Sequence, residues 1–202
     1  MTCYTTQASR TRRGWGPGLL AIFLSCVVAT PMLAGQGATP NAAGFKEFSD
    51  QVQRYLKLQK AVESGLPAMK STDLPEMITA HQQALARKIR EARPHAKPGD
   101  VFTPAASEAF RRASRAALEG PGSAHSRAYM QPGAPNPRMR LAVNGIYPDT
   151  EPITALSPAL LAAFPPLPVE VAYRVVGRTL ILIDVKSRLI VDVARLILPP
   201  AS

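Results

Sequence analysis

The sequence predicts an α+β fold in which amphipathic helices come first and a small antiparallel sheet follows. Three observations lead to this prediction. Apolar residues recur at helical spacing within residues 42–119, Gly, Pro and Ser dominate residues 120–137, and the apolar period changes to two after Val169. The order of these patterns predicts a helical region, a linker, and a region 138–202 that holds a three-stranded meander and one short helix.

The first 34 residues have the order of a cleaved secretory signal peptide. Three arginines within residues 10–13 precede an apolar run from Leu19 to Ala29, and small residues follow up to Ala34. This run spans 11 residues, whereas a membrane-crossing helix needs about 20, so the pattern favours cleavage over an uncleaved anchor. Cleavage fits after Ala34 or after Ala29, and the adjacent arginines leave general and twin-arginine export both open.

Cleavage would deliver a chain of about 168 residues to the periplasm or the medium. Cys3 and Cys26 both precede the cleavage sites, so the sequence predicts a mature chain without a disulfide or a thiolate site. Loss of the leader arginines lowers the formal charge from +10 to about +7, which still favours contact with anionic envelope polymers. Membrane contact is expected only through the leader.

The first predicted helix runs from residue 42 towards Gly65. Apolar residues recur there at steps of three and four, and charged residues occupy the opposite side of the helical wheel. The apolar stripe consists of Phe45, Phe48, Val52, Tyr55, Leu56 and Val62. Gly65 suits a C-terminal cap and Pro67 cannot continue the hydrogen-bond ladder, so the helix is expected to end there.

Two more helices are predicted before residue 120. Asp73 can cap the second helix, Pro75 suits its first turn, and Pro94 ends it. The expected apolar stripe of this helix is Ile78, Leu85, Ile89 and Ala92. Thr103 and Pro104 begin the third helix. Its expected inward residues are Phe110, Ala113 and Ala117.

Residues 120–137 have almost no apolar periodicity, which is typical of a linker. After this linker, residues 138–143 are predicted to form a short strand. Ser157 is predicted to cap a short helix that runs to Phe164, with Pro158 in the first turn.

The predicted meander has strands at residues 171–176, 179–184 and 189–193. Gly177 and Arg178 suit a type II′ turn, which pairs Val176 with Thr179. This register is expected to place Val171, Tyr173, Val175, Leu180, Leu182, Val191 and Val193 on one face, with Ile181, Ile183 and Ile190 on the other. Because a small isolated sheet is marginally stable, helices are expected to cover at least one face.

The same strands contain Tyr173-x-x-Val176-Gly177, the run from Leu180 to Asp184, and the run from Ser187 to Val193. This combination resembles the C-terminal hairpin of small bacterial periplasmic proteins, among them the nickel and cobalt homeostasis family and exported proteins of unknown function. The resemblance covers about 30 of the 202 residues and implies a periplasmic compartment. The His-rich stretch that would support metal handling is absent from this sequence.

A basic set of residues is the first candidate for a binding site. It consists of Arg87, Lys88, Arg90, Arg93, Lys97, Arg111, Arg112 and Arg115. The set contains no interleaved aromatic residues, and Glu91, Asp100 and Glu108 dilute its charge. A solvated helix face is therefore favoured over a nucleic-acid interface.

Histidines and aspartates are the remaining candidates for chemistry. His81, His95 and His125 are not spaced to chelate a metal together. Asp184 and Asp192 have no acid–base partner nearby in the sequence, and aspartates at strand ends usually cap turns or face solvent. The sequence therefore assigns no catalytic, cofactor-binding or metal-binding residue.

These patterns favour a non-enzymatic exported protein that binds an envelope protein or an anionic polymer, without a nucleic-acid partner. Two alternatives stay open: a hydrolase whose site has no recognisable motif, and a periplasmic metal-handling accessory. Exposed apolar surface on the sheet would favour the binding protein, a deep pocket with convergent polar groups the hydrolase, and two histidines beside carboxylates the metal accessory.

Overall fold

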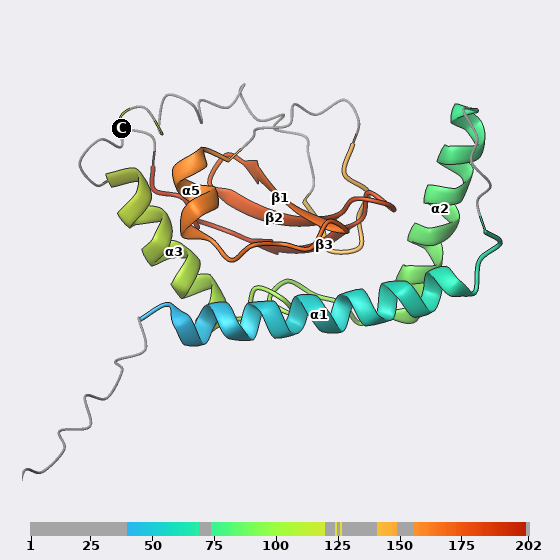
Figure 1. Cartoon of the computed structure of the whole chain (residues 1–202), viewed down its shortest axis with the longest axis horizontal. Coiled ribbons are helices and arrows are strands. Elements are labelled where there is room, and N and C mark those ends of the chain that lie inside the picture. Colours follow the sequence, from blue (N-terminus) through green and yellow to red (C-terminus); the bar gives the residue numbers. More distant parts are fainter. Residues whose placement is uncertain are drawn as a thin grey trace, which may run out of the picture. The chain divides into compact units, whose positions relative to one another are not determined.

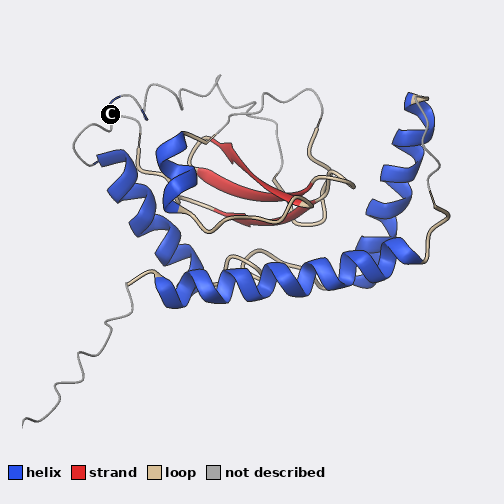
Figure 2. Cartoon of the chain, in the orientation of Figure 1, coloured by secondary structure: helices blue, strands red, loops and turns tan. Residues whose placement is uncertain are grey.

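The computed structural model describes residues 40–68, 74–119, 124, 126, 141–148 and 156–200, all within the unit Gly37–Ser202 (Figure 1). The elements are α1 (Ala42–Ser64), α2 (Pro75–Ala92), α3 (Pro104–Glu119), α5 (Pro158–Ala163), β1 (Val171–Val176), β2 (Thr179–Asp184) and β3 (Ile190–Ala194). Helices therefore precede a three-stranded antiparallel sheet, and the predicted α+β class is confirmed (Figure 2). The leader, Asp73, and the linker other than residues 124 and 126 lie outside the described residues.

Helix α1 lies along the sheet and contributes one continuous apolar face to the core (Figure 1). Its buried large apolar residues are Phe48, Val52, Tyr55 and Leu56, with Phe45 and Val62 partly buried beside them, so the predicted stripe is confirmed. Gly65 caps the helix as expected. Near its start, α1 crosses α3 so closely that a Cβ on Gly44 would lie 2.5 Å from the Ala105 carbonyl oxygen.

Helix α3 places Phe110 at the centre of an aromatic cluster. The Phe110 ring contacts the rings of Phe45, Phe48, Phe102, Phe164 and Tyr173 at centroid distances of 4.7 to 5.9 Å. Thr103 caps the helix, because its Oγ1 accepts a 3.2 Å hydrogen bond from the Ala106 amide. Aromatic packing therefore joins the three helices α1, α3 and α5 to β1.

Every buried residue of α2 lies in its second half, namely Leu85, Ala86 and Ile89. Ile78 is only half-buried, and Ala92 is exposed. The prediction that Ala92 belongs to the apolar stripe is wrong, because the chain leaves the helix there and the following residue, Arg93, takes the inward position. The first half of α2 is thus held by few contacts with the core.

The sheet order is β1-β2-β3, and the predicted pairing of Val176 with Thr179 is confirmed. Gly177 has a φ of 57°, as the first position of a type II′ turn requires. Between β2 and β3 the register shifts: Leu182 pairs with Asp192, whereas Ile183 pairs with Ile190. Strand β3 therefore carries one extra residue, Val191, in a β-bulge.

The bulge corrects one predicted side-chain direction. Val193 packs with Ile181, Ile183 and Ile190 on the face away from the main core, not on the face that the alternation predicted. The extra residue reverses the alternation, so Val191 and Asp192 both point towards the helices. The bulge thus turns the Asp192 carboxylate towards the helices and the main core.

The second face of the sheet is also covered. Tyr147 packs there against the isoleucines, with Leu141 and Val143 partly buried beside it. Residues 141–143 do not form the predicted strand. Instead, Ile146 forms an isolated antiparallel bridge with Leu189, and the Tyr147 amide donates to the Arg188 carbonyl at 2.9 Å.

Candidate functional site

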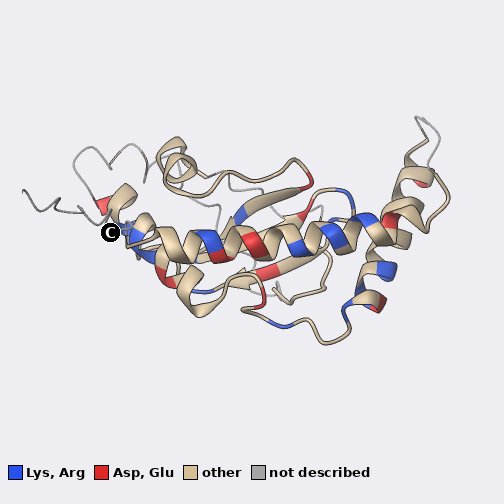
Figure 3. Cartoon of the chain, turned by 60° about the horizontal axis from the view of Figure 1, so that its bottom comes forward, with Lys and Arg blue, Asp and Glu red and all other residues tan. Residues whose placement is uncertain are grey.

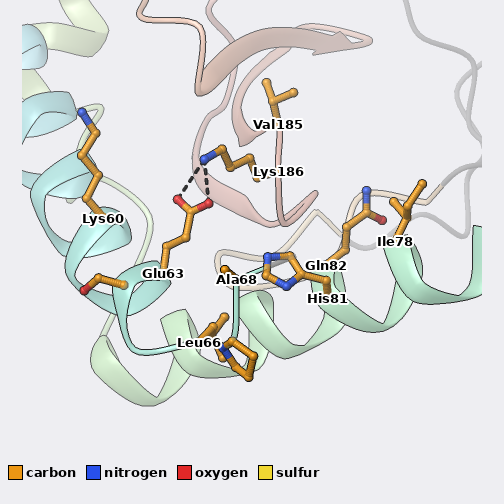
Figure 4. A pocket seen from close by; sticks show the side chains of 11 residues that line it. Lys60, Glu63, Leu66, Ala68, Ile78, His81, Gln82, Val185 and Lys186 are labelled. Atoms are coloured by element: carbon orange, nitrogen blue, oxygen red, sulfur yellow. Dashed lines mark hydrogen bonds and ion pairs between the residues drawn. The ribbon is translucent and has the colours of Figure 1, made fainter. Parts of the chain in front are cut away.

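A pocket of about 810 Å³ opens between the end of α1, the first half of α2 and the β2–β3 turn (Figure 4). We name it the α1–α2 groove. It is lined by Lys60, Glu63 and Ser64 of α1, by residues 66–68, by Ile78, His81 and Gln82 of α2, and by Val185 and Lys186 of the turn. Three segments that are distant in the sequence therefore meet at one open site.

Apolar side chains form much of the groove wall. Leu66 and Ile78 are half-buried there, and Val185 remains 47% exposed. Leu74, the residue before α2, and Met77 within it are 56% and 53% exposed. The start of α2 therefore presents apolar side chains to solvent.

The charged side chains of the groove are paired. Lys186 Nζ donates to both carboxylate oxygens of Glu63, at 2.7 and 2.9 Å (Figure 4). Lys60 Nζ lies 3.9 Å from Glu170, and the Ser64 hydroxyl donates to the Ala61 carbonyl at 2.8 Å. Glu63 is thus held as an ion-paired carboxylate, and Ser64 is held as a helix-end hydroxyl rather than a free nucleophile.

Helix α1 fixes the position of the β2–β3 turn through residues four apart. Tyr55, Gln59 and Glu63 follow one another along one side of α1. The Tyr55 hydroxyl donates to Asp184 at 2.6 Å before the turn, and Glu63 accepts from Lys186 within it. One contact lies about one helical turn before Gln59 and the other about one turn after it. Together they fix the β2–β3 turn that carries Val185.

Asp184 is fully buried and caps the turn that follows it. Its Oδ1 accepts a 2.7 Å hydrogen bond from the Ser187 amide, and its Oδ2 accepts from Tyr55. Burial, and then the negative charge of Asp184, raise the pKa of Tyr55 well above its usual range. Tyr55 therefore stays protonated and acts as a permanent donor.

Asp192 is the second buried carboxylate, and backbone amides surround it. The amides of Gly99, Val101, Phe102 and Val193 all donate to it, at 2.7 to 3.2 Å. Loss of hydration raises the pKa of Asp192, and these amide hydrogen bonds oppose the rise. Neither aspartate faces solvent: Asp184 caps a turn, and Asp192 ties the α2–α3 connection to β3.

Arg93 lies between these two aspartate sites. Its guanidinium is 5.3 Å from the centroid of the Tyr55 ring, and its Nη2 donates to the Val191 carbonyl at 3.2 Å. Burial lowers the pKa of Arg93, while Tyr55, Asp100 and Asp192 raise it. These contacts make Arg93 a structural cation of the core edge.

The other residues of the basic set have separate roles. Arg90 Nε donates to the Asn144 carbonyl, Arg111 pairs with Glu108, and Arg112 donates to the Pro40 carbonyl and to Asn41. Arg87, Lys88, Lys97 and Arg115 are exposed. Figure 3 shows these cations spread over several elements with acidic residues among them.

The histidines also lie apart. His81 lines the α1–α2 groove, His95 is exposed in the α2–α3 connection, and His125 lies outside the described residues. Within the described ranges, no group of three or more His, Cys, Asp or Glu side chains could hold a metal ion. None of the helices that the structure describes is both long and apolar enough to cross a membrane.

Comparison with protein-family models, with curated proteins and with solved structures finds no significant match for this chain. The resemblance of the C-terminal hairpin to periplasmic proteins therefore stays a prediction.

Proposed function

We propose that this chain is an exported, non-enzymatic binding module and that the α1–α2 groove is its ligand site. The observation that carries the proposal is the combination of an open pocket of about 810 Å³ with apolar side chains that remain half exposed around it. Exposed apolar surface that surrounds a concave site is typical of a surface that another molecule covers.

The bonding of the groove's polar groups supports binding over hydrolysis. A hydrolase needs a nucleophile or an activated water with a free base beside it. Glu63 accepts two hydrogen bonds from Lys186, and Ser64 donates to a backbone carbonyl. These groups serve the shape of the groove, so they favour recognition of a ligand without a chemical step.

The sheet does not expose the apolar surface that would favour a binding protein. Ile181, Ile183 and Ile190 are buried on one face, and α1, α3 and α5 cover the other. The apolar residues that stay exposed near a concavity belong to α2 and the β2–β3 turn. The proposed site therefore lies beside the sheet.

Selection from a random-peptide display library tests the proposal with the purified chain as the target. Binding peptides are expected to shift the amide resonances of residues around the groove, and Val185→Asp is expected to abolish binding. Leu161→Asp is the matched control, because Leu161 is 53% exposed on α5 and Val185 is 47% exposed. Peptides that bind elsewhere and tolerate Val185→Asp would contradict the proposal.

A further inference from the structure

We infer that the occupant of the α1–α2 groove is an acidic segment of another protein, with one apolar side chain seated between Ile78 and Val185 and its carboxylates lying along α1. This inference rests on the proposed function and adds the chemistry of the partner. It is carried by the position of a cationic strip that leads into the groove, and by the exposure of the groove's own lysines.

The cationic strip consists of Arg54, Lys57 and Lys60, which are three residues apart on α1 and all exposed. Residues at this spacing are neighbours on a helix surface, and the three span about 9 Å along the axis. Lys60 lines the groove itself, so the strip ends at the groove mouth. Figure 3 shows Lys and Arg gathered on the second half of α1.

Two of these cations have no carboxylate to neutralise them. Within the residues that the structure describes, no acidic side chain lies within 4.0 Å of Arg54 or Lys57, and Lys60 reaches Glu170 only at 3.9 Å. The first half of α1 differs, because Lys46 pairs with Asp50 at 2.7 Å. The unpaired charge is therefore concentrated on the half of α1 that adjoins the groove.

The lysines of the groove are also more exposed than the carboxylates that pair with them. The side chains of Lys60 and Lys186 are 67% and 50% exposed, whereas their partners Glu170 and Glu63 are 21% and 29% exposed. An approaching chain thus meets ammonium groups first. The net positive charge of the protein adds a long-range field of the same sign, which speeds association with acidic partners.

Three apolar side chains of the groove, which we call the apolar seat, explain why a protein segment fits better than a simple polyanion. Ile78, Leu66 and Val185 surround the same space, and the α2 face towards them carries His81 and Gln82 but no charged side chain. A polyanion would leave these apolar side chains uncovered. A segment with one apolar anchor beside acidic residues would cover both the seat and the strip.

The test compares peptides that the display selection recovers, using the purified chain and its variants. Peptides with an apolar residue beside Asp or Glu are expected to dominate. The double variant Arg54→Glu, Lys57→Glu should weaken their binding by about tenfold or more, and added salt should weaken it in the parent chain. The double variant Arg87→Glu, Arg115→Glu is the control, since it makes the same charge change at exposed sites on α2 and α3.

The outcomes separate this inference from the proposed function. Peptides that lie in the groove but lack acidic residues, or that bind the double variant as tightly as the parent, would overturn the acidic partner and leave the binding site intact. Peptides that bind outside the groove, or no binding at all, would overturn both. Thermal melts of the variants check that each still folds.

Discussion

The Tyr55 hydroxyl donates a 2.6 Å hydrogen bond to Oδ2 of Asp184, a residue 129 positions later in the chain. Both groups are buried, so this bond joins α1 to the end of β2 away from solvent. Because a buried carboxylate that loses a donor keeps its full cost of desolvation, the contact has more weight than a surface hydrogen bond.

Tyr55→Phe is therefore expected to lower the free energy of unfolding by about 2 to 4 kcal/mol. Tyr173→Phe is the matched control, because the Tyr173 hydroxyl donates to the neutral Pro165 carbonyl and its loss should cost only about 1 kcal/mol. Urea denaturation of both variants measures the difference. Equal losses would show that Asp184 does not depend on Tyr55.

The raised pKa of Asp192 predicts a pH dependence of stability. Folding shifts this pKa above its ordinary value of 3.8, so the folded chain holds the Asp192 proton at pH values where the unfolded chain has lost it. The contribution of Asp192 to the free energy of unfolding is most favourable below pH 3.8. It is lost as the pH rises through the pKa of Asp192 in the folded chain. Urea denaturation across this window should show the decline in the parent chain but not in Asp192→Asn.

Leu182 is fully buried in the central strand, and its truncation to Ala is expected to cost about 2 to 5 kcal/mol through the cavity that remains. Arg112→Ala should cost at most about 1 kcal/mol, because its ion pair with Glu108 is exposed. Thermal melts compare the two variants. The assignment of the core to the sheet fails if Arg112→Ala melts at the lower temperature.

The close crossing at Gly44 predicts that Gly44→Ala destabilises the chain by about 1 to 3 kcal/mol, because the added methyl group would collide with the Ala105 carbonyl and the Ala109 side chain. Gly65→Ala is the control. A Cβ there meets nothing nearer than the Val62 carbonyl at 3.5 Å, so this variant should match the parent or gain about 0.5 kcal/mol. Chemical denaturation distinguishes the two positions.

The leader pattern predicts that the exported protein begins near Gly35. N-terminal sequencing of the chain from the periplasmic fraction or the medium measures this directly. A cytoplasmic product that still begins at Met1 would contradict export.

Local patterns predicted the elements of the fold well. The apolar stripe of α1 and the Gly177 turn are each set by neighbouring residues, so the helix face and the pairing of Val176 with Thr179 followed from the sequence. The direction of Val193 did not, because a β-bulge inserts one residue and leaves no clear mark in the alternation. The exposure of Ala92 did not follow from the helical period either, because the helix ends there and Arg93 turns inward to donate to the Val191 carbonyl of β3.

The candidate site was less accessible to sequence analysis. Glu63 and Lys186 are 123 positions apart, and each looks like an ordinary surface charge in its own segment. Ile78 was expected on the inward stripe of α2, but it lies in the half of that helix that has no buried side chain. Only the folded chain brings this half of α2 beside the turn.

The placement of the sheet at the end of the chain constrains when folding can occur. Phe48 packs against Tyr173 of β1, Tyr55 donates to Asp184 of β2, and Val191 and Ala194 of β3 belong to the same buried core. The helices that are synthesised first therefore cannot complete their core until the last strand has emerged from the ribosome. Contacts between residues that are far apart in the sequence form slowly. The chain would therefore remain loosely folded throughout its synthesis, and if it is exported as proposed, it would still be loosely folded when it reaches a translocation channel.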